Sequence, residues 1–365
     1  MEELVFYRVG LDKQTWKNIN IIQINNLSNL LNLSNVSISG GQVYKRNVKT
    51  NTGYKRVGKI RIHDEIFNFE FGVVAIKGDI NKLVNYEKIE FNPSSILNQG
   101  INFNPIISSS QLVQVIEIIK NKLKNKYGIL VSFEDARMKA IEININIPLN
   151  KKMREYEIPF NFLLFKVLKK YKKKFPFHHD DFFNGIYSGN KLIEFKIYEK
   201  NKECNLVLSN DTARLEYKIL QEDKIVELIG TNFVKDILND FEWIEKGFYK
   251  AFCDDIYNRI ENVLEQMVKD NLKILNSFKS YKQPFKNFFS SVDANSSFDY
   301  LIIEQVINRS NLIKNKNQRY NIKKLALKRM QEKQTCMIGN LALLNEILVK
   351  LNFKPIIISK YIKVH

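Results

Sequence analysis

The stretch Lys139-Ala-Ile-Glu-Ile-Asn-Ile-Asn-Ile147 decides the fold class of this chain. Isoleucine occupies every second position, and polar residues lie between the isoleucines. Strict alternation predicts a β-strand with one buried face and one polar face. The polar face carries Glu142, Asn144 and Asn146. Glu142 and Asn144 offer the hard oxygen atoms that a phosphodiester-cleaving metal site needs, although an ordinary half-exposed strand shows the same pattern.

Further strands and helices are predicted on both sides of this stretch. Residues 184–203 contain two short alternating runs separated by a turn near 188–191, which is typical of a β-hairpin. Residues 213–219 alternate as another strand, whereas residues 111–124 have helical spacing of apolar side chains. A second helix is expected over residues 159–174, with a lysine-rich end that suits a helix C-terminus. These elements predict an α+β fold with a central antiparallel sheet and flanking helices.

The pattern changes after about residue 228, where helical periodicity becomes dominant. We therefore expect one domain over residues 1–228 and a mostly helical, basic region over residues 229–365. Residues 303–365 contain 13 Lys and Arg against 3 Asp and Glu, a net charge of +10. This concentration favours DNA contact over a merely solvated helix face, with four basic residues as candidates. They are Lys323, Lys324, Lys328 and Arg329, here called the basic quartet.

The composition limits the partners and the compartment. The 365 residues carry a net charge of +18, which indicates a polyanionic partner, either nucleic acid or an acidic membrane surface. No apolar run reaches the length of a membrane span, and the first residues are acidic where a signal peptide is basic. We therefore expect a soluble, cytoplasmic protein that does not bind membranes. The three cysteines form no CxxC pair, so neither disulfides nor zinc are indicated.

Several residues are candidates for chemistry, each with a plainer alternative. Tyr198 and Lys200 form a Tyr-x-Lys pair, in which a cation could stabilise a phenolate nucleophile; a strand-edge tyrosine beside a solvated lysine is the alternative. Glu90, on another short strand, is a candidate third metal ligand. Arg214 shares a strand face with Glu216, so it either pairs with that acid or contacts phosphate.

A second possible metal cluster is the run His178-His179-Asp180-Asp181. Adjacent residues of a regular strand point to opposite faces, so the two histidines cannot chelate one ion from a strand. We expect a loop here, with a metal role as the alternative.

Three stretches, taken in order, resemble the filamentous-phage replication initiators, the gene II/X family of rolling-circle nickases. Residues 89–102 resemble the acidic strand of that family and the turn after it. Residues 140–147 resemble its Arg-Ile-Asp strand, with Ala140 and Glu142 in place of the arginine and the aspartate. Residues 195–203 and 213–219 resemble its tyrosine strand and its Arg-Phe-Glu strand. The agreement covers residues 1 to about 220.

The resemblance implies a DNA-nicking enzyme that acts at a phage or plasmid origin, in the cytoplasm of a bacterial host cell. Tyr198 would be the nucleophile, with Lys200 beside it, and Glu142 would be the acidic residue of the third strand. The expected cofactor is Mg²⁺ or Mn²⁺, held by Glu142 with Asn144 or Glu90. The implied partners are single- and double-stranded origin DNA and a host helicase and polymerase. The non-enzymatic alternative is a sequence-specific DNA-binding initiator or regulator without activity.

Overall fold

The centre of the molecule is an eleven-stranded antiparallel sheet, as predicted. The computed structural model describes residues 7–39, 48–50, 53–76, 79–179, 182–206, 209–277, 298–332 and 339–357. The strand order is β10-β11-β12-β13-β9-β1-β7-β6-β5-β3, and β4 pairs with β5. The bounds are β1 Gly10–Lys17, β3 Val36–Ser39, β4 Val48–Thr50, β5 Gly53–His63, β6 Phe67–Ile76, β7 Asp79–Phe91, β9 Arg137–Pro148, β10 Lys173–His179, β11 Phe182–Gly189, β12 Ile193–Glu199 and β13 Thr212–Ile219. A separate pair joins β2 Asn20–Ile24 to β8 Ile129–Ser132.

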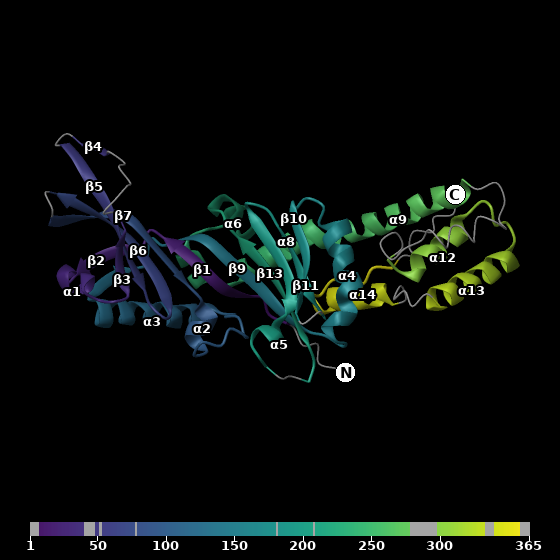
Figure 1. Ribbon diagram of the computed structural model, residues 1–365, viewed down its shortest axis with the longest axis horizontal. Helices are drawn as coiled ribbons and strands as arrows, with labels where there is room; N and C mark the ends of the chain where they lie inside the picture. Colours follow the sequence, from purple (N-terminus) through teal and green to yellow (C-terminus); the bar gives the residue numbers. More distant parts are fainter. Residues whose placement is uncertain are drawn as a thin grey trace.

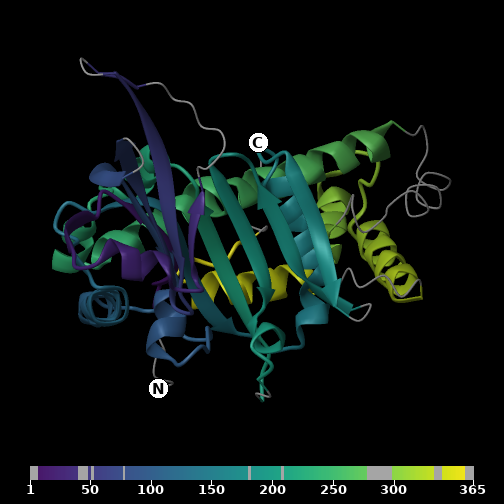
Figure 2. The ribbon, with the colours of Figure 1, turned by 60° about the vertical axis from the view of Figure 1, so that its left-hand side comes forward.

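Helices cover one face of this sheet and extend beyond its end. Figure 2 shows several of them behind the strands, with α14, in yellow, passing behind the sheet. The α-helices are α1 Leu27–Leu31, α2 Pro93–Leu97, α3 Ser109–Tyr127, α4 Glu157–Phe162, α5 Lys200–Glu203, α6 Glu222–Ile229, α7 Val234–Asn239, α8 Glu242–Phe252, α9 Asn258–Asn276, α12 Tyr300–Arg309, α13 Lys316–Glu332 and α14 Asn340–Lys350. The described residues also form a 3₁₀ turn, η1 Met153–Tyr156, and two π-helical turns, η2 Leu163–Val167 and η3 Cys253–Tyr257.

The alternating isoleucines explain how β9 is placed. All four, at positions 141, 143, 145 and 147, are fully buried. Helices α6 and α8 contact β9, so the apolar face of the strand turns toward the helical layer. Because side chains alternate along a strand, the polar residues of β9 face the opposite side of the sheet. This other face holds the candidate site.

The C-terminal helices fall into two groups. Helices α12 and α13 lie at the end of the molecule opposite the β4–β5 tip (Figure 1). Helix α14 returns to the sheet domain, where Glu346 accepts hydrogen bonds from the Tyr156 hydroxyl at 2.6 Å and the Asn150 amide at 2.9 Å. Lys350 donates to the Pro148 carbonyl at 2.7 Å. The mostly helical character of this region is as predicted, and residue 228 lies within α6.

Two local expectations differ from the structure. The lysine-rich end of the helix expected over residues 159–174 is not helical, since the helix ends at η2 and β10 begins at Lys173. His178 and His179 end strand β10 instead of lying in a loop, while Asp180 and Asp181 fall outside the described residues. Within the described ranges, no helix combines the length and apolar character needed to cross a bilayer.

Candidate metal and tyrosine site

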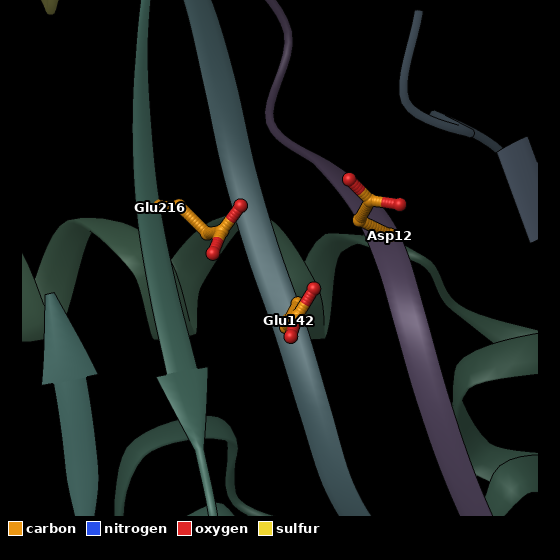
Figure 3. Close-up of side chains that lie close together, drawn as sticks. All are labelled: Asp12, Glu142 and Glu216. Atoms are coloured by element: carbon orange, nitrogen blue, oxygen red, sulfur yellow. The ribbon is translucent and has the colours of Figure 1, made fainter. Parts of the chain in front are cut away.

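Three carboxylates converge on the open face of the sheet. Asp12 lies on β1, Glu142 on β9 and Glu216 on β13, which are neighbouring strands. Figure 3 shows the three side chains on these strands. One oxygen atom from each lies within 4.8 Å of the others. Rigid neighbouring strands therefore hold three hard oxygen donors together.

Asp12 is the most enclosed of the three acids. Its side chain is 2% exposed and forms an ion pair at 2.8 Å with Arg214, which is fully buried. Asn92 and Asn102 also donate to its carboxylate, at 2.6 and 3.0 Å. Burial raises the pKa of Asp12 and outweighs the opposing effect of Arg214. The interior thus fixes the position of this carboxylate while disfavouring its charge.

Glu142 and Glu216 each form an ion pair with a partly exposed lysine. Glu142 pairs with Lys218 at 2.8 Å, and Glu216 pairs with Lys196 at 3.0 Å. Burial and the neighbouring Glu216 charge raise the pKa of Glu142, against the effect of Lys218. Both lysine side chains are 29% exposed, so they can turn toward solvent when another cation binds.

The residues present fit a divalent cation of the Mg²⁺ or Mn²⁺ type. Such ions prefer carboxylate and carbonyl oxygens to nitrogen or sulfur. A further oxygen adjoins the cluster, because Asn144 is fully buried and its Oδ1 has no hydrogen-bond partner within the described structure. The Asn144 amide nitrogen donates to Asp12 at 3.4 Å. The donor set is thus hard, anionic and preorganised.

Tyr198 lies beside this cluster, near the end of β12. Its hydroxyl donates to Glu216 at 3.1 Å, and the residue is 9% exposed. Burial raises the pKa of Tyr198 strongly, and the Glu216 charge adds to the shift. The neutral phenol is therefore the resting form, and its proton already points at a carboxylate.

Lys200 is close to Tyr198, but by a different route from the one expected. The prediction assumed that the strand continues, whereas β12 ends at Glu199 and Lys200 is the first residue of α5. The helical turn carries its ammonium to 5.6 Å from the centre of the Tyr198 ring. The side chain is fully buried and also pairs with Glu203.

A cleft of about 470 Å³ opens onto these groups. Its lining includes the three acids, Tyr198, and Phe177 and His179 of β10. His179 thus lines the same cleft as the acidic cluster without belonging to that cluster. The remaining lining residues are Asn102, Asn184, Lys196, Lys202 and Glu203.

The three predicted metal ligands do not all belong to the acidic cluster. Glu142 is in the cluster and Asn144 is adjacent to it, but Glu90 is not a member. Glu90 forms an ion pair with Lys13 at 2.5 Å and another with Lys88 at 3.8 Å. The third and fourth oxygen-bearing groups near Glu142 are instead Asp12 and Glu216.

Arg214, expected to pair with Glu216 or to contact phosphate, has other partners in this arrangement. The side chain is fully buried and donates to Asn146 at 2.8 Å, to Asp12 and to the Phe103 carbonyl. No part of its guanidinium reaches the surface, so it positions Asp12. The expected pair with Glu216 is replaced by this one.

The basic quartet lies on α13, at the end of the molecule opposite the β4–β5 tip (Figure 1). Lys323 pairs with Glu304 at 2.9 Å, and Lys324 is exposed. Contact of this helix with DNA remains a prediction.

Asp12 and Glu216 were missed as ligands for different reasons. Glu216 was visible as an acid on an alternating strand, at a position that pairs with Asn144. The alternation of residues 213–219 was the signal that the sequence offered for Glu216. Asp12 gave no such signal, because the apolar residues Leu11 and Trp16 of β1 do not follow a strict alternation, and the pairing of β1 with β9 shifts register beside Asp12.

Comparisons with known proteins add little to this description. The sequence matches no family model, and no curated protein is detectably similar to it. Among solved structures, the chain is similar to a rolling-circle replication initiator protein from Geobacillus stearothermophilus, with 12% identity and a TM-score of 0.30. The similarity covers 64% of this chain and 80% of that protein. Similarity at this level carries no argument about the activity of the chain.

Proposed function

We propose that this chain is a metal-dependent DNA-nicking enzyme that initiates rolling-circle replication. The observation that carries the proposal is the hydrogen bond of 3.1 Å from the Tyr198 hydroxyl to Glu216, a member of the three-acid cluster. A nucleophile, a proton acceptor and a hard-cation site thus share one cleft. The net charge of +18 fits a nucleic-acid substrate.

In the proposed reaction, the Tyr198 oxygen attacks the scissile phosphorus and the bond from phosphorus to the 3′-oxygen breaks. The phenol proton passes to Glu216, and the departing 3′-oxygen takes up a proton from solvent. The products are a 5′-phosphotyrosyl link and a free 3′-OH. A Mg²⁺ or Mn²⁺ ion held by Asp12, Glu142 and Glu216 would polarise the phosphate. The Lys200 ammonium stabilises negative charge near the tyrosine ring.

The role as initiator extends this chemistry. A free 3′-OH at an origin primes synthesis of a new strand, so the partners would be origin DNA and a host helicase and polymerase. The order of the three motif stretches is the basis for the finer proposal, an initiator of the filamentous-phage type.

Covalent capture tests the proposal directly. A pool of random single-stranded oligonucleotides, labelled at the 3′ end, is incubated with the protein and Mn²⁺. We expect label on the protein after denaturing electrophoresis, mapped by mass spectrometry to Tyr198 and absent with chelator or with Tyr198→Phe. Tyr187→Phe is the matched control, because the Tyr187 hydroxyl, like that of Tyr198, is hydrogen-bonded to a glutamate, in this case Glu194. Adduct lost in the Tyr187 variant but kept in Tyr198→Phe would reassign the nucleophile. DNA binding without any adduct would favour a non-enzymatic initiator or regulator.

A further inference from the structure

Strand β10 is an edge of the sheet and borders the cleft. Alternation places Lys173, Phe175 and Phe177 on one face of this strand, since their register with β11 is unbroken. Phe177 lines the cleft, so Phe175 and Lys173 continue the same face away from it. From Lys173 to Phe177 the strand spans about 13 Å.

The aromatic rings on this face are held in place and yet accessible. Phe175 is 49% exposed and stacks on Tyr187 of β11, with 4.8 Å between ring centres and 20° between ring planes. The Tyr187 hydroxyl is hydrogen-bonded to Glu194, and this bond holds the Tyr187 ring in place beneath Phe175. One face of the Phe175 ring is thus covered, while half of the residue faces solvent.

Phe177 reaches from this pair toward the nucleophile. It lies opposite Gly185, where a Cβ atom would come within 2.6 Å of the Phe177 ring and 2.9 Å of the Tyr198 Cα. Only glycine leaves room for the ring at this point. The φ angle of Gly185, +156°, also disfavours other residues. The ring therefore lies over the backbone of β11, next to Tyr198.

We propose that Phe175, Phe177 and Tyr187 form a stacking platform for unpaired bases of single-stranded DNA next to the cleft. This inference rests on the proposed function, because it places the substrate strand across the open face toward Tyr198. Aromatic faces accept any base, and lysines attract the phosphates between bases. Lys173 is exposed at one end of the platform, and Lys196 and Lys202 line the cleft at the other. A duplex does not fit this mode, since its bases are already stacked.

Binding of a fluorescein-labelled single-stranded oligonucleotide of mixed sequence, followed by anisotropy in chelator, tests the platform without cleavage. We expect Phe175→Ala to weaken binding by roughly 5- to 150-fold, the range for loss of one base–aromatic stack. Phe175→Trp should bind at least as well as the wild type. Phe165→Ala is the matched control, with a ring 48% exposed on η2, and should change nothing.

Two further arms separate stacking from charge and from folding. Lys173→Gln should lower the slope of log affinity against log salt by about 0.7, while Phe175→Ala leaves it unchanged. Binding of the matching duplex should be insensitive to Phe175→Ala. If the alanine variant does not fold, Phe175→Leu keeps an apolar contact with Tyr187 but offers no aromatic face.

Single-strand binding by Phe175→Ala within twofold of the wild type would overturn the platform, as would an equal loss on duplex. Its failure is distinguishable from that of the proposed function. A wild-type chain that binds through Phe175 but forms no adduct contradicts the nicking proposal alone. A chain that forms the Tyr198 adduct, with binding indifferent to Phe175, contradicts the platform alone.

Discussion

Replacing Glu142 by glutamine removes one of the three clustered carboxylates and should remove most of the stabilisation of the protein by Mn²⁺. At a concentration 100 times the dissociation constant, a ligand that binds only the folded chain stabilises it by about 2.7 kcal/mol. Unfolding 365 residues at about 2.1 cal/mol/K per residue gives an entropy of about 0.8 kcal/mol/K, so the melting temperature rises by about 3 to 4 °C. A 100-fold weaker site at the same Mn²⁺ concentration leaves about 0.4 kcal/mol, or about 0.5 °C.

Thermal unfolding followed by circular dichroism, with Mn²⁺ or with chelator, measures this difference. Glu90→Gln is the control, because Glu90 pairs with Lys13 outside the cluster, and it should respond to Mn²⁺ like the wild type. A wild-type chain without a Mn²⁺ shift, or a shift lost in Glu90→Gln and kept in Glu142→Gln, would refute the assignment of the metal site.

The same experiment has a definite pH dependence. Burial raises the pKa of Asp12 and, with Glu216, that of Glu142. An acid with a raised folded-state pKa favours folding below its unfolded value of about 4, and this contribution is lost as pH rises through the folded value. The metal-free chain should therefore lose stability over that window. Because Mn²⁺ competes with protons for these acids, its stabilising shift should grow over the same window and be smallest in acid.

Three other predictions concern stability and DNA contact. Arg214→Met should lower the free energy of unfolding in urea by about 3 to 5 kcal/mol, because it leaves Asp12 buried and unpaired. Adding Asp12→Asn should recover most of this loss, and a single variant as stable as the wild type would contradict the prediction. Glu346→Ala should cost about 1 to 3 kcal/mol by the same assay, since the Tyr156 hydroxyl loses its acceptor, and no change would mean that α14 is not anchored there. Changing the basic quartet to glutamine should flatten the salt dependence of duplex binding by about two to four units while nicking of single strands survives, and an unchanged slope would exclude α13 as the main contact.

The sheet was predictable where its signal is local. The alternation of β9 and β13 and the hairpin of β11 and β12 follow from side-chain period alone, and the structure contains these strands. The helix expected over residues 111–124 is α3, which extends it by a few residues at each end. Tyr198 and Glu142, both singled out from the sequence, border one cleft.

The lysine run at 166–174 shows where a local signal misleads. Cations at a helix C-terminus are favourable, so a helix end was the natural prediction. The structure instead buries Leu168 and Tyr171 after η2 and starts an edge strand at Lys173. Pairing with β11 supplies the backbone hydrogen bonds there. Tertiary pairing thus overrides the helical preference of the lysines.

The alternation of β13 could not predict which residues of its open face are buried, because a segment distant in the sequence covers part of that face. Arg214, Glu216 and Lys218 occupy successive positions of one face and look equivalent in sequence. The loop that follows α2 places the Phe103 carbonyl against the Arg214 guanidinium, so that residue is sealed and structural. Glu216 lines the cleft, and the Lys218 side chain, at 29% exposed, reaches solvent. Along this face of β13 the side chains therefore pass from the interior, through the cleft, to solvent. The proposed chemistry lies at the middle position, Glu216, whose carboxylate is held by its surroundings and is still open to a phosphate in the cleft.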